Sequence, residues 1–255
     1  MSDKNTISIR ECFAGKGVLL TGSTGFLAKA VVEKLLRDLP EIGQIYLLIR
    51  SRVKSDGSRV DARERLRDEI LRNSAFRRLR EQHGDDFERF CDSKITCVAG
   101  NLTAPRLGLD DDQFTELSKK VHIVMNSAAT VVFDERLDLA LDLNTMGPQR
   151  MLEFAHAAGA IYVHISTAYV SGKRTGFIPE KLLDPMEAID AQLPAGVPRP
   201  QSFDVKEEVA RLQELAKTVS ADCQKILTQK GISPESEEGA TQLRVALVAA
   251  GMRRA

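Results

Sequence analysis

A turn near the start of this chain combines residue types that could hold phosphate groups. It lies between the apolar run Gly17 to Leu20 and a helical pattern, and its seven residues are Thr21, Gly22, Ser23, Thr24, Gly25, Phe26 and Leu27. Glycines let the backbone bend tightly and let a pyrophosphate approach bare N–H groups at the start of a helix. A small Ala28 lets that helix pack closely on the strand. The turn therefore predicts a dinucleotide site formed by these seven residues.

Two arginines follow the second apolar run, Gln44 to Ile49. Sites specific for NAD place an Asp or Glu there, about 20 residues after the glycines, where it accepts a hydrogen bond from the ribose 2′-OH. Arg50 and Arg52 cannot accept that bond, but a guanidinium can pair with a 2′-phosphate through two hydrogen bonds. The pattern therefore favours NADPH, with Arg50 as the first contact and Arg52 as the second. The alternative is that both arginines only begin the charged segment that follows.

Amide and small side chains follow the next two predicted strands. Asn101 and Leu102 come after the third strand, where the amide could meet the edge of an adenine and the leucine could pack on its face. Ser127, Ala128 and Ala129 come after the fourth strand, where small residues permit close approach of the nicotinamide half. Because ligands of such folds bind over the carboxyl ends of the strands, we predict that all five residues contact the cofactor.

Hydroxyl groups follow the fifth predicted strand, at Ser166 and Thr167. A hydroxyl at the carboxyl end of that strand would stand beside the nicotinamide. There it could donate a hydrogen bond to a carbonyl oxygen that gains negative charge during hydride transfer. The chemistry is therefore expected at this segment.

The elements that must position these residues are five short apolar runs separated by helical patterns. This alternation is typical of a parallel sheet covered by helices on both faces. Right-handed crossovers would give the spatial strand order 3-2-1-4-5. We therefore predict an α/β fold, a doubly wound parallel sheet of the Rossmann type with helical insertions. The predicted strands are Gly17 to Leu20, Gln44 to Ile49, Lys94 to Val98, His122 to Asn126 and Ile161 to Ile165.

Two segments extend this minimal fold. Residues 1–178 are expected to form an NADP-binding Rossmann domain with a charged helical insertion at about 51–92. Balanced charge of that kind favours a solvated helix held by ion pairs four residues apart, and the alternative is a docking surface for an anionic substrate tail or a partner. Residues 179–255 form a loop-rich and then helical insertion, with a helical pattern from Asp204 through Thr218.

Composition argues against several other classes of function. The chain has 36 basic and 36 acidic side chains among 255 residues and few aromatic ones, so we predict no nucleic-acid partner. Its cysteines and histidines lack metal-ligand spacing, so we predict no metal site. Scattered thiols are the usual state of cysteines in a reducing cytosol. The first residues form no apolar leader, and no apolar stretch approaches the ~20 residues that span a membrane. We therefore expect a cytoplasmic protein.

Taken together, these motifs resemble those of the fatty acyl-CoA reductase family, a branch of the extended short-chain dehydrogenase/reductases. The resemblance covers about the first 180 residues. It is carried by Thr21 to Ala28, Leu48 to Arg50, Asn126 to Thr130, Asn144 with Thr145, His164 to Val170 and Ile178 to Glu180. It implies NADPH-dependent reduction of an acyl thioester, held on coenzyme A or on an acyl carrier, to an aldehyde, and it leaves the alcohol open as a further product.

The resemblance also implies roles for individual residues. As catalytic residues, Thr167 would hold the substrate carbonyl and Asn144 would support the active-site water and lysine. Thr130 and Tyr169 would border the substrate. Long acyl substrates reside in membranes, so peripheral membrane contact stays open. The sequence indicates no oligomeric state.

One part of the family pattern is not found. Such enzymes carry a tyrosine and a lysine four residues apart on a later helix, and the phenol protonates the reduced oxygen. The only match is Tyr169 with Lys173, a poor one because it contains Gly172 and follows closely on a strand end. We therefore expect that the chain stops before the true pair and supplies the cofactor-binding half of an enzyme, with little or no activity by itself. The alternatives are a carrier-protein thioester reductase domain and a non-catalytic NADP-binding module.

Overall fold

The computed structural model describes residues 8–54, 57–132, 135–172, 174–182, 184–190, 196–198 and 202–252. Contacts between residues divide the chain into two compact units. The first consists of Met1–Thr130 and Asp142–Ile165, and the second of Val131–Leu141 and Ser166–Ala255. The first unit contains a parallel sheet, and the regular elements described in the second are helices and helical turns.

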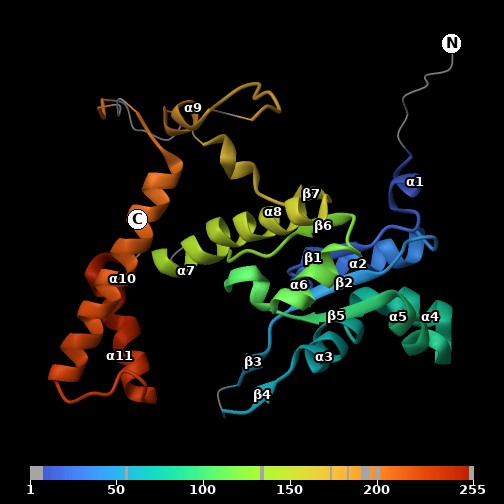
Figure 1. Ribbon diagram of the computed structural model, residues 1–255, viewed down its shortest axis with the longest axis horizontal. Helices are drawn as coiled ribbons and strands as arrows, with labels where there is room; N and C mark the ends of the chain where they lie inside the picture. The colour runs from blue at the N-terminus through green and yellow to red at the C-terminus, as the bar shows by residue number, and fades with distance from the viewer. Residues whose placement is uncertain are drawn as a thin grey trace. The chain divides into compact units, whose positions relative to one another are not determined.

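A five-stranded parallel sheet forms the centre of the first unit (Figure 1). Its strands lie in the order β5-β2-β1-β6-β7, which confirms the predicted spatial order of the five apolar runs. Every adjacent pair is parallel. Each strand begins and ends within one residue of the predicted position. The strands are β1 (Val18–Thr21), β2 (Ile45–Ile49), β5 (Ile95–Ala99), β6 (Ile123–Asn126) and β7 (Ile161–His164).

Apolar side chains on both faces of the sheet explain why helices cover both. On one face, Leu20 belongs to a buried cluster with Val32 of α2 (Phe26–Asp38). On the other, Leu19 belongs to a second cluster with Phe154 of α8 (Gly147–Ala158). This two-sided packing confirms the doubly wound α/β fold. The helices and turns of this part are α1 (Ile9–Phe13), α2 (Phe26–Asp38), a 3₁₀ turn (Pro105–Gly108), α6 (Asp111–Ser118), a π-helical turn (Asp142–Met146) and α8 (Gly147–Ala158).

The charged segment after β2 forms a two-stranded ribbon and a series of short helices. Ion pairs four residues apart lie on its outer side, as the sequence predicts, and Arg72 with Asp68 is one of them. However, Ile70, Phe76 and Leu79 are fully buried in the core, so the segment is a packed layer and more than a solvated helix. Its elements are β3 (Arg52–Val53), β4 (Arg59–Val60), α3 (Ala62–Arg65), a π-helical turn (Leu66–Leu71), a 3₁₀ turn (Ser74–Phe76), α4 (Arg77–His83), a 3₁₀ turn (Gly84–Asp86) and α5 (Phe87–Lys94).

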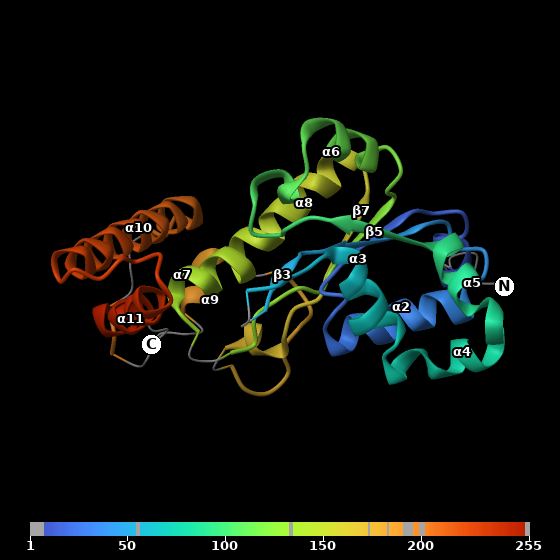
Figure 2. The ribbon, with the colours of Figure 1, turned by 90° about the horizontal axis from the view of Figure 1, so that it is seen from below.

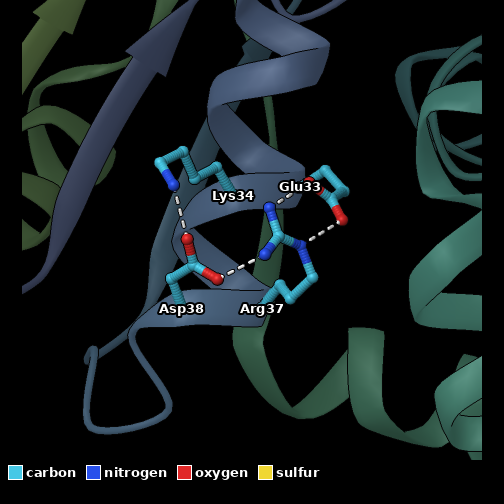
Figure 3. A network of polar contacts seen from close by, with 4 residues as sticks. All are labelled: Glu33, Lys34, Arg37 and Asp38. Atoms are coloured by element: carbon cyan, nitrogen blue, oxygen red, sulfur yellow. Dashed lines mark hydrogen bonds and ion pairs between the residues drawn. The ribbon is translucent and has the colours of Figure 1, made fainter.

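The polar side of α2 carries a chain of ion pairs, shown in Figure 3. Arg37 donates hydrogen bonds to Glu33 at 2.8 Å and to Asp38 at 2.5 Å, and Lys34 donates to Asp38 at 2.5 Å. The hydrogen bond from Lys34 holds the pKa of Asp38 below its ordinary value. The Lys34–Asp38 pair is largely exposed and adds little stability, whereas the Glu33 side chain that Arg37 binds is mostly buried. Together with this contact, the apolar stripe of α2 against the sheet fixes the helix, and with it the glycine turn.

In the second unit, α10 and α11 pack side by side (Figure 2). The Asp204 side chain begins α10 by accepting hydrogen bonds from two backbone N–H groups. The helix runs to Gln229, beyond the predicted end at Thr218, because Cys223 packs in a small core with Leu247. Among the described residues, no helix is long and apolar enough to span a membrane. The elements are α7 (Leu137–Leu141), a 3₁₀ turn (Ala168–Ser171), α9 (Pro185–Asp190), α10 (Val205–Gln229), α11 (Glu237–Leu247) and a π-helical turn (Val248–Met252).

Candidate functional site

A cavity of about 240 Å³ lies over the carboxyl ends of the strands in the first unit. This is the edge of the sheet at which the sequence predicts a ligand. Most of the predicted cofactor-binding residues line it, namely Thr21, Gly22, Ser23, Thr24, Gly25, Arg50, Asn101, Leu102, Ser127, Ala128 and Ala129. Three predicted residues, Phe26, Leu27 and Arg52, are not part of the lining. The fold thus brings together residues that are far apart in the sequence.

The glycine turn forms one wall of the cavity and needs glycine at Gly22. This residue has a φ of 74°, and a Cβ atom there would lie 2.7 Å from the carbonyl oxygen of Ser127. Gly25 donates its N–H to the Gly22 carbonyl at 2.8 Å and begins α2 without a side-chain cap. The first N–H groups of α2 therefore have no capping side chain, which suits an anion at the helix N-terminus.

Ser23 contributes a hydroxyl group that lacks a partner. The residue is 1% exposed, and its Oγ atom is buried without a hydrogen-bond partner in the described part of the chain. Buried polar groups are normally paired, so such a group calls for an explanation. Because Ser23 lines the cavity, a ligand bound there could supply the missing acceptor.

A buried polar network joins the ends of three neighbouring strands beside the cavity. The Thr21 hydroxyl donates to Asn126 Oδ1 at 2.6 Å and accepts from the backbone N–H groups of Ser127 and Ala128, each at 3.2 Å. Asn126 Nδ2 lies 3.2 Å from His164 Nδ1. The network holds the start of the Ser127 segment against β1. Asn126 is fully buried and was not among the predicted site residues, although its place at the end of a predicted strand was a signal for it.

A tight loop after β5 forms another part of the cavity wall. The side-chain oxygen of Asn101 accepts hydrogen bonds from the backbone N–H and the hydroxyl of Thr103. The backbone N–H of Asn101 donates to the Leu107 carbonyl at 2.7 Å. Leu107 is buried with a φ of 62°, a conformation that leucine rarely adopts. Packing of Leu107 therefore holds a strained turn that fixes where Asn101 and Leu102 stand.

Asn144 lies in the first unit and forms a reciprocal pair with the backbone of Thr130. Its Oδ1 accepts from the Thr130 N–H at 2.8 Å, and its Nδ2 donates to the Thr130 carbonyl at 3.0 Å. The amide thus acts as a clamp on the end of the segment that follows β6. This contact brings together two residues that the sequence predicts to act in one site.

The end of β2 is held by an arginine that sequence reasoning did not select. Arg65 is 8% exposed, lines the cavity, and donates to the Arg50 carbonyl at 2.7 Å. It also binds both carboxylate oxygens of Glu69, at 3.0 and 2.8 Å, which keeps the pKa of Glu69 below its ordinary value. Within the described residues, no carboxylate forms an ion pair with Arg50. By contrast, Arg52 Nη2 lies 3.4 Å from Glu69 Oε1.

Thr167 and Tyr169 belong to the second unit. The Thr167 hydroxyl accepts a hydrogen bond from the backbone N–H of Tyr169 at 3.3 Å and so begins a 3₁₀ turn. Tyr169 is 78% exposed. Lys173, which forms the poor match to a catalytic pair with Tyr169, lies outside the described residues. The predicted roles of Thr167 and Tyr169 therefore stay predictions.

Clusters of metal ligands and reactive thiols would be other sources of chemistry in the described part of the molecule. No group of three or more His, Cys, Asp or Glu side chains gathers there to hold a metal. Burial raises the pKa of Cys91 to about 12, and it also raises the pKa of Cys97. Thiols of this kind are poor nucleophiles near neutral pH.

Residues 20–235 match the sequence profile NAD_binding_4, described as "Male sterility protein". The chain belongs to this family. It is 42% identical over 180 residues to "Fatty acyl-CoA reductase 2, chloroplastic" of Arabidopsis thaliana, a match that covers 70% of this chain and 28% of that protein. It is 39% identical over 189 residues to "Alcohol-forming fatty acyl-CoA reductase" of Simmondsia chinensis, with 73% and 37% covered. The predicted resemblance to fatty acyl-CoA reductases is confirmed.

This member of the family spans between 28% and 37% of the length of those two relatives. Among solved structures, it resembles the terminal R domain from the myxalamid PKS-NRPS biosynthetic pathway, with a TM-score of 0.52 at 24% identity. That match covers 79% of this chain and 45% of the R domain. At this level of identity the likeness shows a shared fold.

Proposed function

We propose that this protein binds NADPH in the cavity over the strand ends and takes part in the reduction of a fatty acyl thioester. The single observation that carries the proposal is the cavity, because the glycine turn, Arg50, Asn101 and Ser127 all line it. The relatives named as fatty acyl-CoA reductases support the reaction class.

The residues of the cavity fit a dinucleotide. Gly22 leaves the space that a Cβ atom would fill, and the start of α2 offers N–H groups without a side-chain cap. These groups would hold the pyrophosphate, with the unpartnered Ser23 hydroxyl as a further donor. Ser127 and the alanines after it would border the nicotinamide half. When bound, the reduced nicotinamide would supply a hydride to a carbonyl carbon.

Arg50 supports NADPH rather than NADH. Arg50 lines the cavity at the end of β2, and no ion pair with a described carboxylate neutralises its guanidinium. A ribose 2′-phosphate would pair with this charge, whereas a 2′-hydroxyl would leave it unused.

The side chains proposed for the chemistry act on the thioester carbonyl. The Thr167 hydroxyl would donate a hydrogen bond to the carbonyl oxygen as it gains negative charge. Addition of hydride to the carbonyl carbon and loss of the thiolate would then leave an aldehyde. A second hydride and a proton would convert the aldehyde to an alcohol. Asn144 would act as a positioning residue, since it clamps the backbone of Thr130.

A two-part experiment tests the proposal. Calorimetric titration should show that NADPH binds with a lower Kd than NADH. The protein is then incubated with NADPH and a long-chain acyl-CoA, and nicotinamide oxidation and free thiol are followed together. Equal release of thiol and oxidised cofactor is the expected result for aldehyde formation. Absence of binding by either nucleotide would refute the whole proposal. Binding without thiol release would agree with the low activity that the sequence predicts for this chain by itself, whereas thiol release without nicotinamide oxidation would refute the reductase reaction.

A further inference from the structure

A second cavity, of about 580 Å³, shares Arg50, Gly100 and Asn101 with the first. Its lining includes Arg52 and Arg59 as well, and none of the described residues that line it is acidic. Because the two cavities meet at the end of β2, a ligand in the first could extend a charged group into the second. The clustering of guanidinium groups indicates that this group is an anion.

The ribbon of β3 and β4 brings Arg59 to this place. Arg59 pairs with Val53 in antiparallel register, so the chain folds back toward the end of β2. The Arg59 guanidinium then donates from Nη2 to Ser51 Oγ at 3.1 Å. Ser51 directly follows Arg50 and also lines the second cavity. The hydroxyl therefore orients the Arg59 guanidinium without neutralising its charge.

The three arginines differ in how far their charges are compensated. Arg52 lies 3.4 Å from Glu69, whose carboxylate is already bound by Arg65. In the described part of the chain, neither Arg50 nor Arg59 forms an ion pair. Two uncompensated guanidinium groups match the charge of close to −2 that a phosphomonoester carries at neutral pH.

We propose that Arg59 is a second specificity-determining residue, which binds the 2′-phosphate of NADPH together with Arg50. The inference rests on the proposed function and deepens it. A phosphomonoester on a ribose could also come from the 3′-phosphate of coenzyme A. The residues shared between the two cavities favour the 2′-phosphate, since Arg50 and Asn101 line the site assigned to the dinucleotide.

Small bisphosphates separate the two sources without any catalytic turnover. The protein is titrated calorimetrically with 2′,5′-ADP, with 3′,5′-ADP, with NADPH and with NADH. Arg59→Ala should raise the Kd of 2′,5′-ADP and of NADPH about 10-fold, which corresponds to about 1.4 kcal/mol, and change the Kd of NADH less than about 2-fold. Arg59→Lys should recover part of the loss, because it keeps the charge but not the planar fork. Arg63→Ala is the matched control, because it removes an exposed arginine of the same segment that lines neither cavity.

Three results would overturn the inference. The first is an Arg59→Ala variant that binds 2′,5′-ADP as tightly as the unaltered protein. The second is a loss of affinity for 3′,5′-ADP with 2′,5′-ADP unaffected, which would assign the cavity to coenzyme A. The third is an equal loss for NADPH and NADH, which would indicate a general disturbance. If the unaltered protein binds neither dinucleotide, the proposed function itself fails, so the two failures are distinguishable.

Discussion

Ser23 carries a hydroxyl that is buried in the glycine turn and unpaired among the described residues. An unpaired buried hydroxyl costs about 1–3 kcal/mol. Ser23→Ala should therefore keep or raise the unfolding temperature of the free protein. If the hydroxyl donates to the bound dinucleotide, the same variant should bind NADPH about 3- to 10-fold more weakly. Thermal unfolding of the free protein and calorimetric titration measure the two effects.

Ser93→Ala is the matched control for that variant, since Ser93 is exposed and donates only to a nearby carbonyl on α5. It should change neither quantity. A Ser23→Ala protein that melts at a lower temperature yet binds NADPH normally would show that the hydroxyl serves the free fold instead.

At the residue scale, the proposed preference for NADPH depends on Arg50. Arg50→Ala should raise the Kd of NADPH about 30-fold, because charge-assisted hydrogen bonds to a phosphate are worth roughly 1.5–3 kcal/mol. The Kd of NADH should change by less than about 2-fold. Fluorescence titration of the reduced nicotinamide measures both constants. Equal losses for the two cofactors would mean that Arg50 does not contact the 2′-phosphate.

At the scale of elements, the Arg65 and Glu69 pair connects the helical segment to the end of β2. Arg65 is almost fully buried, and it donates to the Arg50 carbonyl as well as to Glu69. Removal of the carboxylate would leave a buried guanidinium without its counter-charge, which is costly. The pair therefore stabilises the backbone from which the proposed 2′-phosphate contact extends.

Glu69→Gln tests this connection through its pH dependence. The hydrogen bond from Arg65 lowers the pKa of Glu69 in the folded protein. The contribution of Glu69 to the free energy of unfolding is therefore present above the pKa of this carboxyl group in the unfolded chain, about 4.3. It is lost as the pH falls through the lower pKa of the folded protein. We expect the variant to be less stable by about 1–2 kcal/mol at neutral pH, with the difference shrinking below about pH 4. Urea unfolding at several pH values measures the difference in stability between the two proteins. A difference that stays constant down to about pH 3 would contradict the prediction.

Sequence patterns predicted the strands better than the charged segment, and the elements show why. Each sheet strand is a short apolar run bounded by turns, so local residue types mark it. The segment after β2 carries apolar side chains at irregular spacing, and a π-helical turn at Leu66–Leu71 shifts which of them face the core. The balanced charge of the segment therefore indicated its ion pairs but not the burial of Ile70 and Phe76.

At the scale of the whole molecule, the predicted site residues fall into two groups. Those predicted to bind the cofactor lie in the sheet unit, and most of them line one cavity. Asn144 and Thr130 lie in the same unit and are hydrogen-bonded to each other. Thr167 and Tyr169 lie in the other unit. The residues proposed to hold the cofactor therefore share one unit, and the residues proposed to hold the carbonyl and border the substrate come from both.

The sequence by itself determined the five strands, their order and the position of the glycine turn, because these depend on local apolar runs, on glycine and on the handedness of crossovers. Only the tertiary structure decided that Thr21 pairs with Asn126, that Arg65 supports Arg50, and that the Ser23 hydroxyl has no partner among the described residues. Thr21 and Asn126 are separated by 105 positions. Whether a polar side chain is paired depends on which distant segments pack against it, and no local pattern of residues contains that information.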